Sequence, residues 1–124
     1  MKKFFLCKIC GNLTGLIESS GVPMICCGEP MTELIPNTEE AAVEKHLPAV
    51  KTEDGVLTVH VGSILHPMLP EHHISFVYVE TANGGQRKML KIGEEPICRF
   101  TFIDDAPVAV YAYCNLHGMW KTDV

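Results

Sequence analysis

The stretch that decides the fold is residues 74–92, ISFVYVETANGGQRKMLKI. Ile74 to Thr81 is rich in β-branched and aromatic residues, which favour a strand. Asn83-Gly84-Gly85 has the composition of a tight turn, and Gln86 to Ile92 follow as a second extended segment. The stretch therefore predicts a β-hairpin.

Further short strands are expected on both sides of this hairpin, each bounded by Pro, Gly or Asp. The segments are Val56 to Val61, Ile97 to Ile103 and Val108 to Cys114. Strands at intervals of roughly ten residues, with no helical periodicity between them, are typical of an antiparallel β-sandwich or barrel.

The N-terminal part has a different character. Its short apolar pieces are separated by glycines as far as Pro36, and a segment of about 35 residues cannot build a sufficient core without a metal or disulfides. Asn37 to Glu44 is polar and is expected to form a linker with a helical turn capped by Asn37 or Thr38. We therefore expect two domains, residues 1–36 and 37–124.

The composition excludes some function classes. The chain has 124 residues and a net charge of −5, and no basic face that would bind nucleic acid. The apolar start ends at Lys8, which is too early for a secretory signal. No stretch approaches the roughly 18 apolar residues of a membrane span. A cytoplasmic protein is expected, in which six cysteines indicate metal ligands before disulfides.

The first candidate site consists of four cysteines close to the N-terminus: Cys7, Cys10, Cys26 and Cys27. Cys7 and Cys10 form a CxxCG motif, in which two thiolates face one metal and Gly11 permits the tight return. The second pair is adjacent in sequence, so binding both thiolates to one ion strains the backbone. A four-thiolate site suits iron or zinc. A structural zinc ribbon and a disulfide pair are the alternatives.

The second candidate site combines four histidines with one cysteine. Cys114 and His117 lie at a strand end, His66 and His72 lie in a proline-bounded loop, and His46 follows the linker. Four imidazoles and one thiolate would fill five positions of an octahedron, which zinc seldom allows, and would leave one position open. A thiolate opposite the open position favours redox chemistry on a bound oxygen species.

These motifs together resemble the desulfoferrodoxin family. The residues that carry the resemblance are Cys7-x2-Cys10, Cys26-Cys27-Gly28-Glu29-Pro30-Met31, Glu44-Lys45-His46, His66-Pro67-Met68, His72 and Cys114-Asn115-x-His117-Gly118. The resemblance extends from residue 7 to residue 118. It implies a mainly β fold, with a small desulforedoxin-like (rubredoxin-type) metal domain followed by an immunoglobulin-like antiparallel β-sandwich.

The resemblance also implies an activity, the reduction of superoxide to hydrogen peroxide by a superoxide reductase. Two iron ions per chain are implied: one on the four cysteines, and one with His46, His66, His72 and His117 in its equatorial plane and Cys114 as axial thiolate. Lys45 would attract the superoxide anion, and Glu44 would be the carboxylate that occupies the sixth position once product has left. A homodimer and electrons from rubredoxin or a similar donor are expected.

Other functions remain open from the residues alone. An electron carrier or redox sensor would use only the first site, and a peroxidase or dismutase would use the second site for another reaction. Four further residues are expected to lie outside the ligand sets: His73 should point away from the site, His60 should be an ordinary strand histidine, Cys98 should pack as a small buried hydrophobe, and Trp120 should shield the site or pack in the core.

Overall fold

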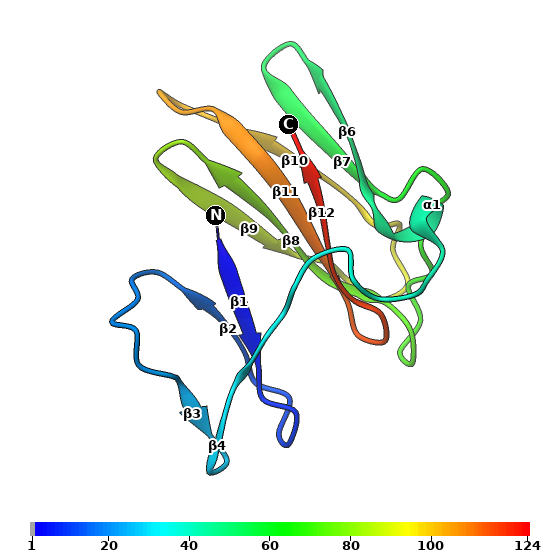
Figure 1. Cartoon of the computed structure of the whole chain (residues 1–124). Helices are drawn as coiled ribbons and strands as arrows, with labels where there is room; N and C mark the ends of the chain where they lie inside the picture. The colour runs from blue at the N-terminus through cyan, green and yellow to red at the C-terminus, as the bar shows by residue number, and fades with distance from the viewer. Residues whose placement is uncertain (1) are drawn as a thin grey trace. The chain divides into compact units, whose positions relative to one another are not determined.

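The structure, a computed structural model, describes residues 2–124. The chain divides into two compact units, Met1–Ile35 and Pro36–Val124, and each is built almost entirely of antiparallel strands (Figure 1). Within the described residues, no helix has both the length and the apolar character that crossing a membrane requires.

The first unit is a small strand assembly with very little core. A three-stranded sheet has the order β2-β1-β5, and β3 and β4 form a separate hairpin. The strands are β1 (Lys3–Leu6), β2 (Leu13–Leu16), β3 (Ile25–Cys26), β4 (Glu29–Pro30) and β5 (Thr32–Glu33). Among its described residues, the buried hydrophobic side chains are those of Phe4 and Cys7. Two buried side chains cannot stabilise 35 residues, so this unit depends on a cross-link.

The second unit is a sandwich of two antiparallel sheets. One sheet has the order β10-β7-β6 and the other the order β12-β11-β8-β9. The elements are α1 (Val43–His46), β6 (Pro48–Glu53), β7 (Val56–Val61), β8 (Ile74–Thr81), β9 (Gly84–Met89), β10 (Ile97–Thr101), β11 (Pro107–Cys114) and β12 (Gly118–Asp123). The mainly β fold class expected from the sequence is confirmed.

The core lies between the two sheets and follows from residue alternation. In β7, Leu57, Val59 and Val61 are buried while the residues between them are less so. They join one hydrophobic cluster with side chains of the other sheet, among them Val79 and Val110. The alternating apolar residues predicted from the sequence thus form the face through which the two sheets contact each other.

Side chains bridge the two sheets along both open sides of the sandwich. Thr122 Oγ1 on β12 donates a hydrogen bond to the Pro48 carbonyl on β6, at 2.6 Å. On the other side, Gln86 Nε2 and Lys88 Nζ on β9 donate to backbone carbonyls of β10. These contacts satisfy carbonyl groups on edge strands that would otherwise be open to pairing with another chain.

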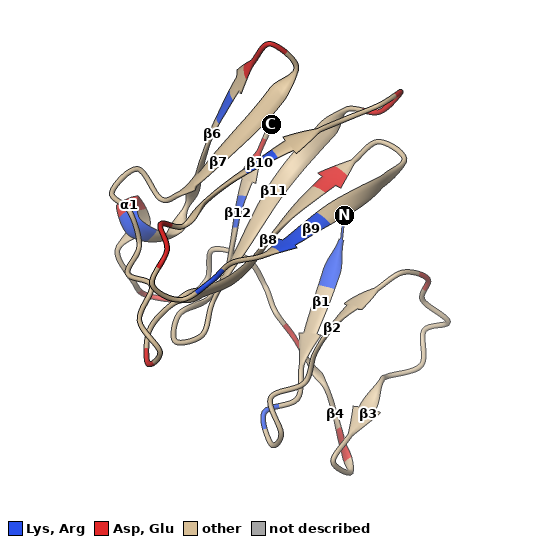
Figure 2. Ribbon diagram, turned by 180° about the vertical axis from the view of Figure 1, so that it is seen from behind, with Lys and Arg blue, Asp and Glu red and all other residues tan. Residues whose placement is uncertain are grey.

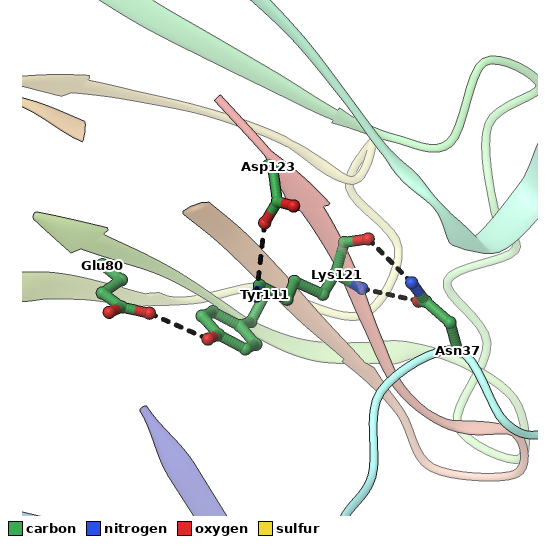
Figure 3. Close-up of polar contacts among 5 residues, drawn as sticks. All are labelled: Asn37, Glu80, Tyr111, Lys121 and Asp123. Atoms are coloured by element: carbon green, nitrogen blue, oxygen red, sulfur yellow. Dashed lines mark hydrogen bonds and ion pairs between the residues drawn. The ribbon is translucent and has the colours of Figure 1, made fainter. Parts of the chain in front are cut away.

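The linker is tied to the second sheet through Asn37 (Figure 3). Its Nδ2 donates to the Lys121 carbonyl at 3.1 Å, and its Oδ1 accepts the Lys121 N–H at 2.8 Å. The same part of the sheet carries a Tyr111–Glu80 hydrogen bond of 2.8 Å and a Lys121–Asp123 ion pair of 3.2 Å. Asn37 therefore anchors the chain on β12.

Several sequence predictions need correction. The helical turn lies at Val43–His46 and not within residues 37–44, because the Asn37 side chain binds Lys121 and caps no helix. The second strand of the hairpin begins in the expected turn and ends at Met89, and the strand from Ile97 ends at Thr101. Strands β6 and β12 were not predicted.

Two local irregularities shape the end of the sandwich that carries α1. The pairing of β11 with β8 shifts register, so that Tyr113 lies opposite Phe76 whereas Cys114 lies opposite Ile74. Such a bulge re-aims the side chains beside it. At the end of β7, Gly62 lies directly against α1: a Cβ there would come within 2.5 Å of the Glu44 carbonyl oxygen and 3.0 Å of the Leu47 carbonyl oxygen.

We predict that Gly62→Ala lowers the free energy of unfolding by about 1–3 kcal/mol, because the backbone of α1 must move to admit the methyl group. Chemical denaturation followed by circular dichroism measures this change. Gly15→Ala is the matched control, since its Cβ would meet chiefly the flexible end of Lys2, with Cε at 3.1 Å. Equal stability of the two variants would contradict the close approach of α1.

Candidate metal centres

The four N-terminal cysteines converge on one point. Their sulfur atoms all lie within 4.8 Å of one another, and Cys10 Sγ is 3.6 Å from Cys26 Sγ. Four sulfurs arranged as a tetrahedron around a metal at about 2.3 Å lie about 3.8 Å apart. The spacing therefore suits a tetrahedral four-thiolate metal site.

The backbone explains how these side chains meet. Gly11 has φ of 85° and donates its N–H to the Cys7 carbonyl at 2.9 Å, which closes the CxxCG turn. The adjacent pair is brought together by Cys27, whose φ of 52° lies in the left-handed region. This conformation, unfavourable for a residue with a Cβ, lets two neighbouring cysteines face the same point. This is the backbone strain that the sequence predicts for Cys26 and Cys27, two adjacent ligands of one ion.

The pKa values of three of these thiols are shifted by their neighbours. The Cys10 backbone N–H lowers the pKa of Cys7 to about 6. Hydrogen bonds with the Cys10 and Cys7 sulfurs raise the pKa of Cys27 to about 12, and the same two neighbours raise the pKa of Cys26. Four thiolates so close together repel one another, so all four ionise together only around a metal ion.

The second cluster lies at one end of the sandwich, on segments far apart in sequence. His46 ends α1, and Cys114 ends β11. His66 and His72 come from the loop between β7 and β8, and His117 comes from the turn between β11 and β12. The β11 bulge lies beside Cys114. Chain reversals at one end of the sandwich thus collect all five side chains.

The four imidazole rings form a closed square. Ring centroids of neighbours are 4.6 Å apart for His46–His66, 4.5 Å for His66–His72, 5.1 Å for His72–His117 and 5.0 Å for His117–His46. The diagonal His46–His72 distance is longer, 6.4 Å. His46 Nε2 lies 3.2 Å from both His66 Nε2 and His117 Nδ1. Nitrogens at right angles on one metal, with bonds of about 2.1 Å, lie about 3 Å apart.

Cys114 completes a pyramid on this square. Its sulfur is 3.5 Å from His66 Nε2 and 3.9 Å from His117 Nδ1. It also lies within 4.8 Å of the ligand atoms of His46, His72 and His117, which form a metal-binding group with it. The sulfur accepts the His117 backbone N–H at 3.4 Å, an interaction that stabilises a thiolate. Burial raises the pKa of the Cys114 thiol, so a cation is needed to hold it ionised.

Backbone carbonyls orient two of the rings. His46 Nδ1 lies 2.7 Å from the Ala42 carbonyl, and His66 Nδ1 lies 2.7 Å from the Pro67 carbonyl. Each Nδ1 therefore carries the proton and donates it, which leaves Nε2 as a free lone pair aimed into the square. Burial lowers the pKa of His66 to about 4 and lowers that of His46. Both rings are therefore neutral near pH 7, as metal ligands must be.

His72 supplies a direct indication that an ion belongs here. Its Nε2 is buried and has no hydrogen-bond partner among the described residues. A buried polar atom without a partner is costly, and a metal ion would satisfy it. The residues present therefore fit a metal with five ligands, three bound through Nε2, one through His117 Nδ1 and one through sulfur.

Glu44 and Lys45 lie on the exposed side of α1, next to buried His46. The helix shows both an acidic and a basic segment in Figure 2. Burial lowers the pKa of His46 and the Ala42 hydrogen bond raises it; the smaller effects are those of His117 and Lys45, which lower it, and of Glu44, which raises it. The fields of both charges therefore reach the second cluster.

The remaining residues singled out from sequence lie outside both clusters. His73 Nδ1 lies 3.0 Å from the Leu69 carbonyl, and His73 belongs to neither metal-binding group. His60 is a half-buried residue within β7. Cys98 was expected to be buried; it is only half-buried at the edge of the core, although burial still raises its pKa to about 11.

The sequence did not single out the carbonyl partners of the rings, and it left open whether Trp120 shields the site or packs in the core. The Trp120 indole lies 5.0 Å from the His46 ring and donates its N–H to the His117 carbonyl at 3.0 Å. It therefore both shields and orients the cluster. The signal for the role of Trp120 in the sequence was its position shortly after Cys114 and His117. Core packing explained that position equally well.

Comparisons with known proteins agree with this geometry. The family model described as desulfoferrodoxin matches residues 38–123, and that of the desulfoferrodoxin N-terminal domain matches residues 1–34. A desulfoferrodoxin of Syntrophotalea carbinolica is 38% identical over 96% of this chain and 94% of its own length.

Solved structures give the same result. The crystal structure of the superoxide reductase from Treponema pallidum is 34% identical, covers 99% of both chains and superposes with a TM-score of 0.83. A superoxide reductase (1Fe-SOR) from Giardia intestinalis is 26% identical with a TM-score of 0.54, and matches 65% of this chain against 97% of its own length. This chain therefore extends beyond what the shorter protein shares with it.

Domains of this kind bind two iron ions, and the chain provides one four-cysteine group and one histidine–cysteine group. The expectation of two iron ions per chain is thereby confirmed. Since both family models match, and together they span nearly all of the sequence, the chain belongs to the desulfoferrodoxin family.

Proposed function

We propose that this chain is a superoxide reductase, which adds one electron and two protons to superoxide and releases hydrogen peroxide. The observation that carries the proposal is the square of four imidazoles with Cys114 on one side. Five protein ligands leave one position of an octahedron open, as a redox site for a small oxygen species needs and a structural site does not. The names of the relatives support the same reaction.

In this proposal, His46, His66, His72, His117 and Cys114 hold the catalytic iron, and Cys7, Cys10, Cys26 and Cys27 hold the second iron. Iron bound in the histidine–cysteine group would supply a one-electron redox couple and an open coordination position. The four-cysteine group holds its metal with sulfur alone, which suits electron transfer and stabilises a unit with almost no core.

Lys45 has the task of attracting the substrate. The chain carries a net charge of −5, so an anion is repelled by the molecule as a whole unless a local positive field guides it. Lys45 is exposed next to His46, and its charge is felt at that ring. Its ammonium group would also stabilise the negative charge that grows on the oxygen species during reduction, before protons arrive from water.

Glu44 would act after the reduction. Its carboxylate is exposed on the same helical turn as His46, and a carboxylate is a suitable ligand for a position vacated by product.

Buried Trp120 covers the His46 ring on one face and so limits the access of water to the cluster.

The electron donor would be rubredoxin or a similar small redox protein. Exposed apolar side chains on the loops that carry the ligands support a protein donor: Ile64, Leu65, Leu69 and Leu116. Such residues around a buried redox site suit brief contact with another protein. None of the six cysteines, all of which the structure describes, forms a disulfide, which suits the reducing cytoplasm as the place of action.

A homodimer is also part of the proposal. Ile17 and Val22 in the first unit are 90% and 75% exposed, and apolar surface of this kind is suited to cover by a second copy. Sedimentation equilibrium of the iron-loaded protein tests this part independently of the reaction.

We predict that Lys45→Ala lowers the second-order rate constant with superoxide by about tenfold or more and weakens its dependence on ionic strength, because the local positive field is lost. Pulse radiolysis with detection of superoxide decay measures both. Lys51→Ala changes the net charge equally at an exposed residue of β6 that pairs with Glu53, and should leave the rate unchanged. Equal rates for the two variants would remove Lys45 from the mechanism.

The two iron sites should be separable by substitution, because their ligand sets share no residue. We predict that Cys10→Ser loses the four-thiolate absorption and that His66→Ala loses the thiolate-to-iron band of the other site, each variant keeping about half of the iron. Metal analysis and visible spectroscopy measure this. His73→Ala is the matched control for His66→Ala. Full iron content in His66→Ala would exclude His66 as a ligand.

The same preparations decide between the proposal and its alternatives. A superoxide reductase consumes reductant and evolves no oxygen, whereas a dismutase needs no reductant and releases oxygen, which an oxygen electrode detects. Full superoxide reactivity in Cys10→Ser and none in His66→Ala would support the second centre as the site of catalysis. The reverse result would leave an electron carrier that uses only the four-cysteine site.

A further inference from the structure

His72 is one of two ligands of the square, with His117, whose rings have no hydrogen bond to a backbone carbonyl among the described residues. His46 and His66 each bind a backbone carbonyl through Nδ1, whereas no hydrogen bond in the described chain fixes the His72 ring to a carbonyl. Its loop is closed on itself, because Leu69 and His72 exchange both backbone hydrogen bonds, at 2.9 and 3.1 Å. Those contacts shape the loop but do not join it to the strand end that carries Cys114.

Asn115 makes that connection. Its Oδ1 accepts the backbone N–H of His73 at 2.8 Å, and its Nδ2 donates to the carbonyl of Glu71 at 3.0 Å. Its own backbone N–H donates to the His73 carbonyl at 3.2 Å. The Asn115 side chain thus forms hydrogen bonds with the peptide groups on both sides of His72. In the described chain, the hydrogen bonds between residues 67–73 and residues 115–117 all belong to Asn115.

The position of Asn115 in the chain makes these contacts effective. It directly follows Cys114 and precedes His117 by two residues, so its backbone is fixed by two ligands of the same cluster. A displacement of its loop relative to residues 71–73 would move the His72 ring against Cys114 and His117 at once. The primary amide suits the task, because it offers one acceptor and one donor to a carbonyl and an N–H that face it together.

We propose that Asn115 is a positioning residue that sets His72 in the ligand square by clamping the backbone on both sides of it. Asn115 touches neither substrate nor metal in this role and acts only through His72. The inference rests on the proposed ligand set of the second centre, but not on which reaction that centre performs. Outer contacts of this kind commonly change metal affinity by about 10- to 100-fold when they are removed.

The test compares iron release from the purified two-iron protein and from Asn115→Ala. Ferrous iron is withdrawn by a chelator that absorbs visible light, and the loss of each centre is followed by its own absorption. We expect the variant to lose iron from the histidine–cysteine centre about 10- to 100-fold faster. We also expect an altered ferric electron paramagnetic resonance signal of that centre, because the His72 ring is displaced. The four-cysteine centre, in the same chain, should be unchanged.

Two further variants sharpen the result. Asn115→Asp keeps the acceptor for the His73 N–H but loses the donor to Glu71, so it should release iron at a rate between those of the wild type and Asn115→Ala. Leu116→Ala is the matched control, since this neighbouring side chain is 59% exposed, and its release rate and spectrum should equal the wild type.

Unchanged release and an unchanged spectrum in Asn115→Ala would overturn the proposal. Equal loss of both centres would also overturn it, since that result indicates general unfolding and not a displaced ligand. The readouts are independent of superoxide reduction. A protein that fails to reduce superoxide, yet releases iron selectively in Asn115→Ala, would refute the proposed function and leave this inference standing.

Discussion

The structure of the second unit depends on one constraint, the convergence of two buried imidazoles, two half-buried imidazoles and a buried thiol on a point that suits a cation. Two of the histidines, His46 and His66, are each only 2% exposed, and Cys114 is fully buried. Burial of this many polar atoms is unfavourable unless each finds a partner. The carbonyls of Ala42 and Pro67 satisfy the outward nitrogens, while the inward nitrogens have only one another and the ion.

The sandwich meets this constraint by placing its ligands on α1, at the end of β11 and in the connections between strands. Strands are too regular to aim five side chains at one point, since successive residues face opposite sides of a sheet. The loop between β7 and β8, the turn between β11 and β12 and the single turn of α1 provide the needed freedom. Gly62 allows α1 to lie against the end of β7. The shift of register beside Cys114 directs its sulfur toward the four imidazoles. The core between the sheets keeps these chain ends in place.

The first unit solves the opposite problem. It has too few buried side chains to fold on apolar contacts, with Phe4 and Cys7 as its buried hydrophobic residues in the described part. A metal bound by its four cysteines would supply folding energy here, as in other small metal-stapled domains. Cys27 lies in the left-handed region, and a bond from its sulfur to a metal ion would offset the strain of that conformation. In the proposed function, one chain would use metal for stability in one unit and for chemistry in the other.

Much of this could be predicted from the sequence, for identifiable reasons. Alternating residues in Val56–Val61 and the turn after Ile74–Thr81 predicted strands, because local propensity and burial agree there. Strands β6 and β12 were missed, because residues such as Lys51 and Lys121 have little strand propensity of their own, and pairing with the adjacent strands β7 and β11 overrides it. The helical turn was misplaced because the Asn37 side chain satisfies β12 and not a helix end.

The sequence by itself determined the composition of both metal sites, since cysteine and histidine in these spacings have few other uses in a chain of this size. Only the tertiary structure decided their geometry: the order of the rings around the square, the choice of Nδ1 for His117 and Nε2 for the others, and the clamp that Asn115 places around His72. The physical reason is that spacing along the chain fixes which residues are near in sequence. The angles at which they meet depend on loops whose paths are set by packing and by hydrogen bonds to remote strands.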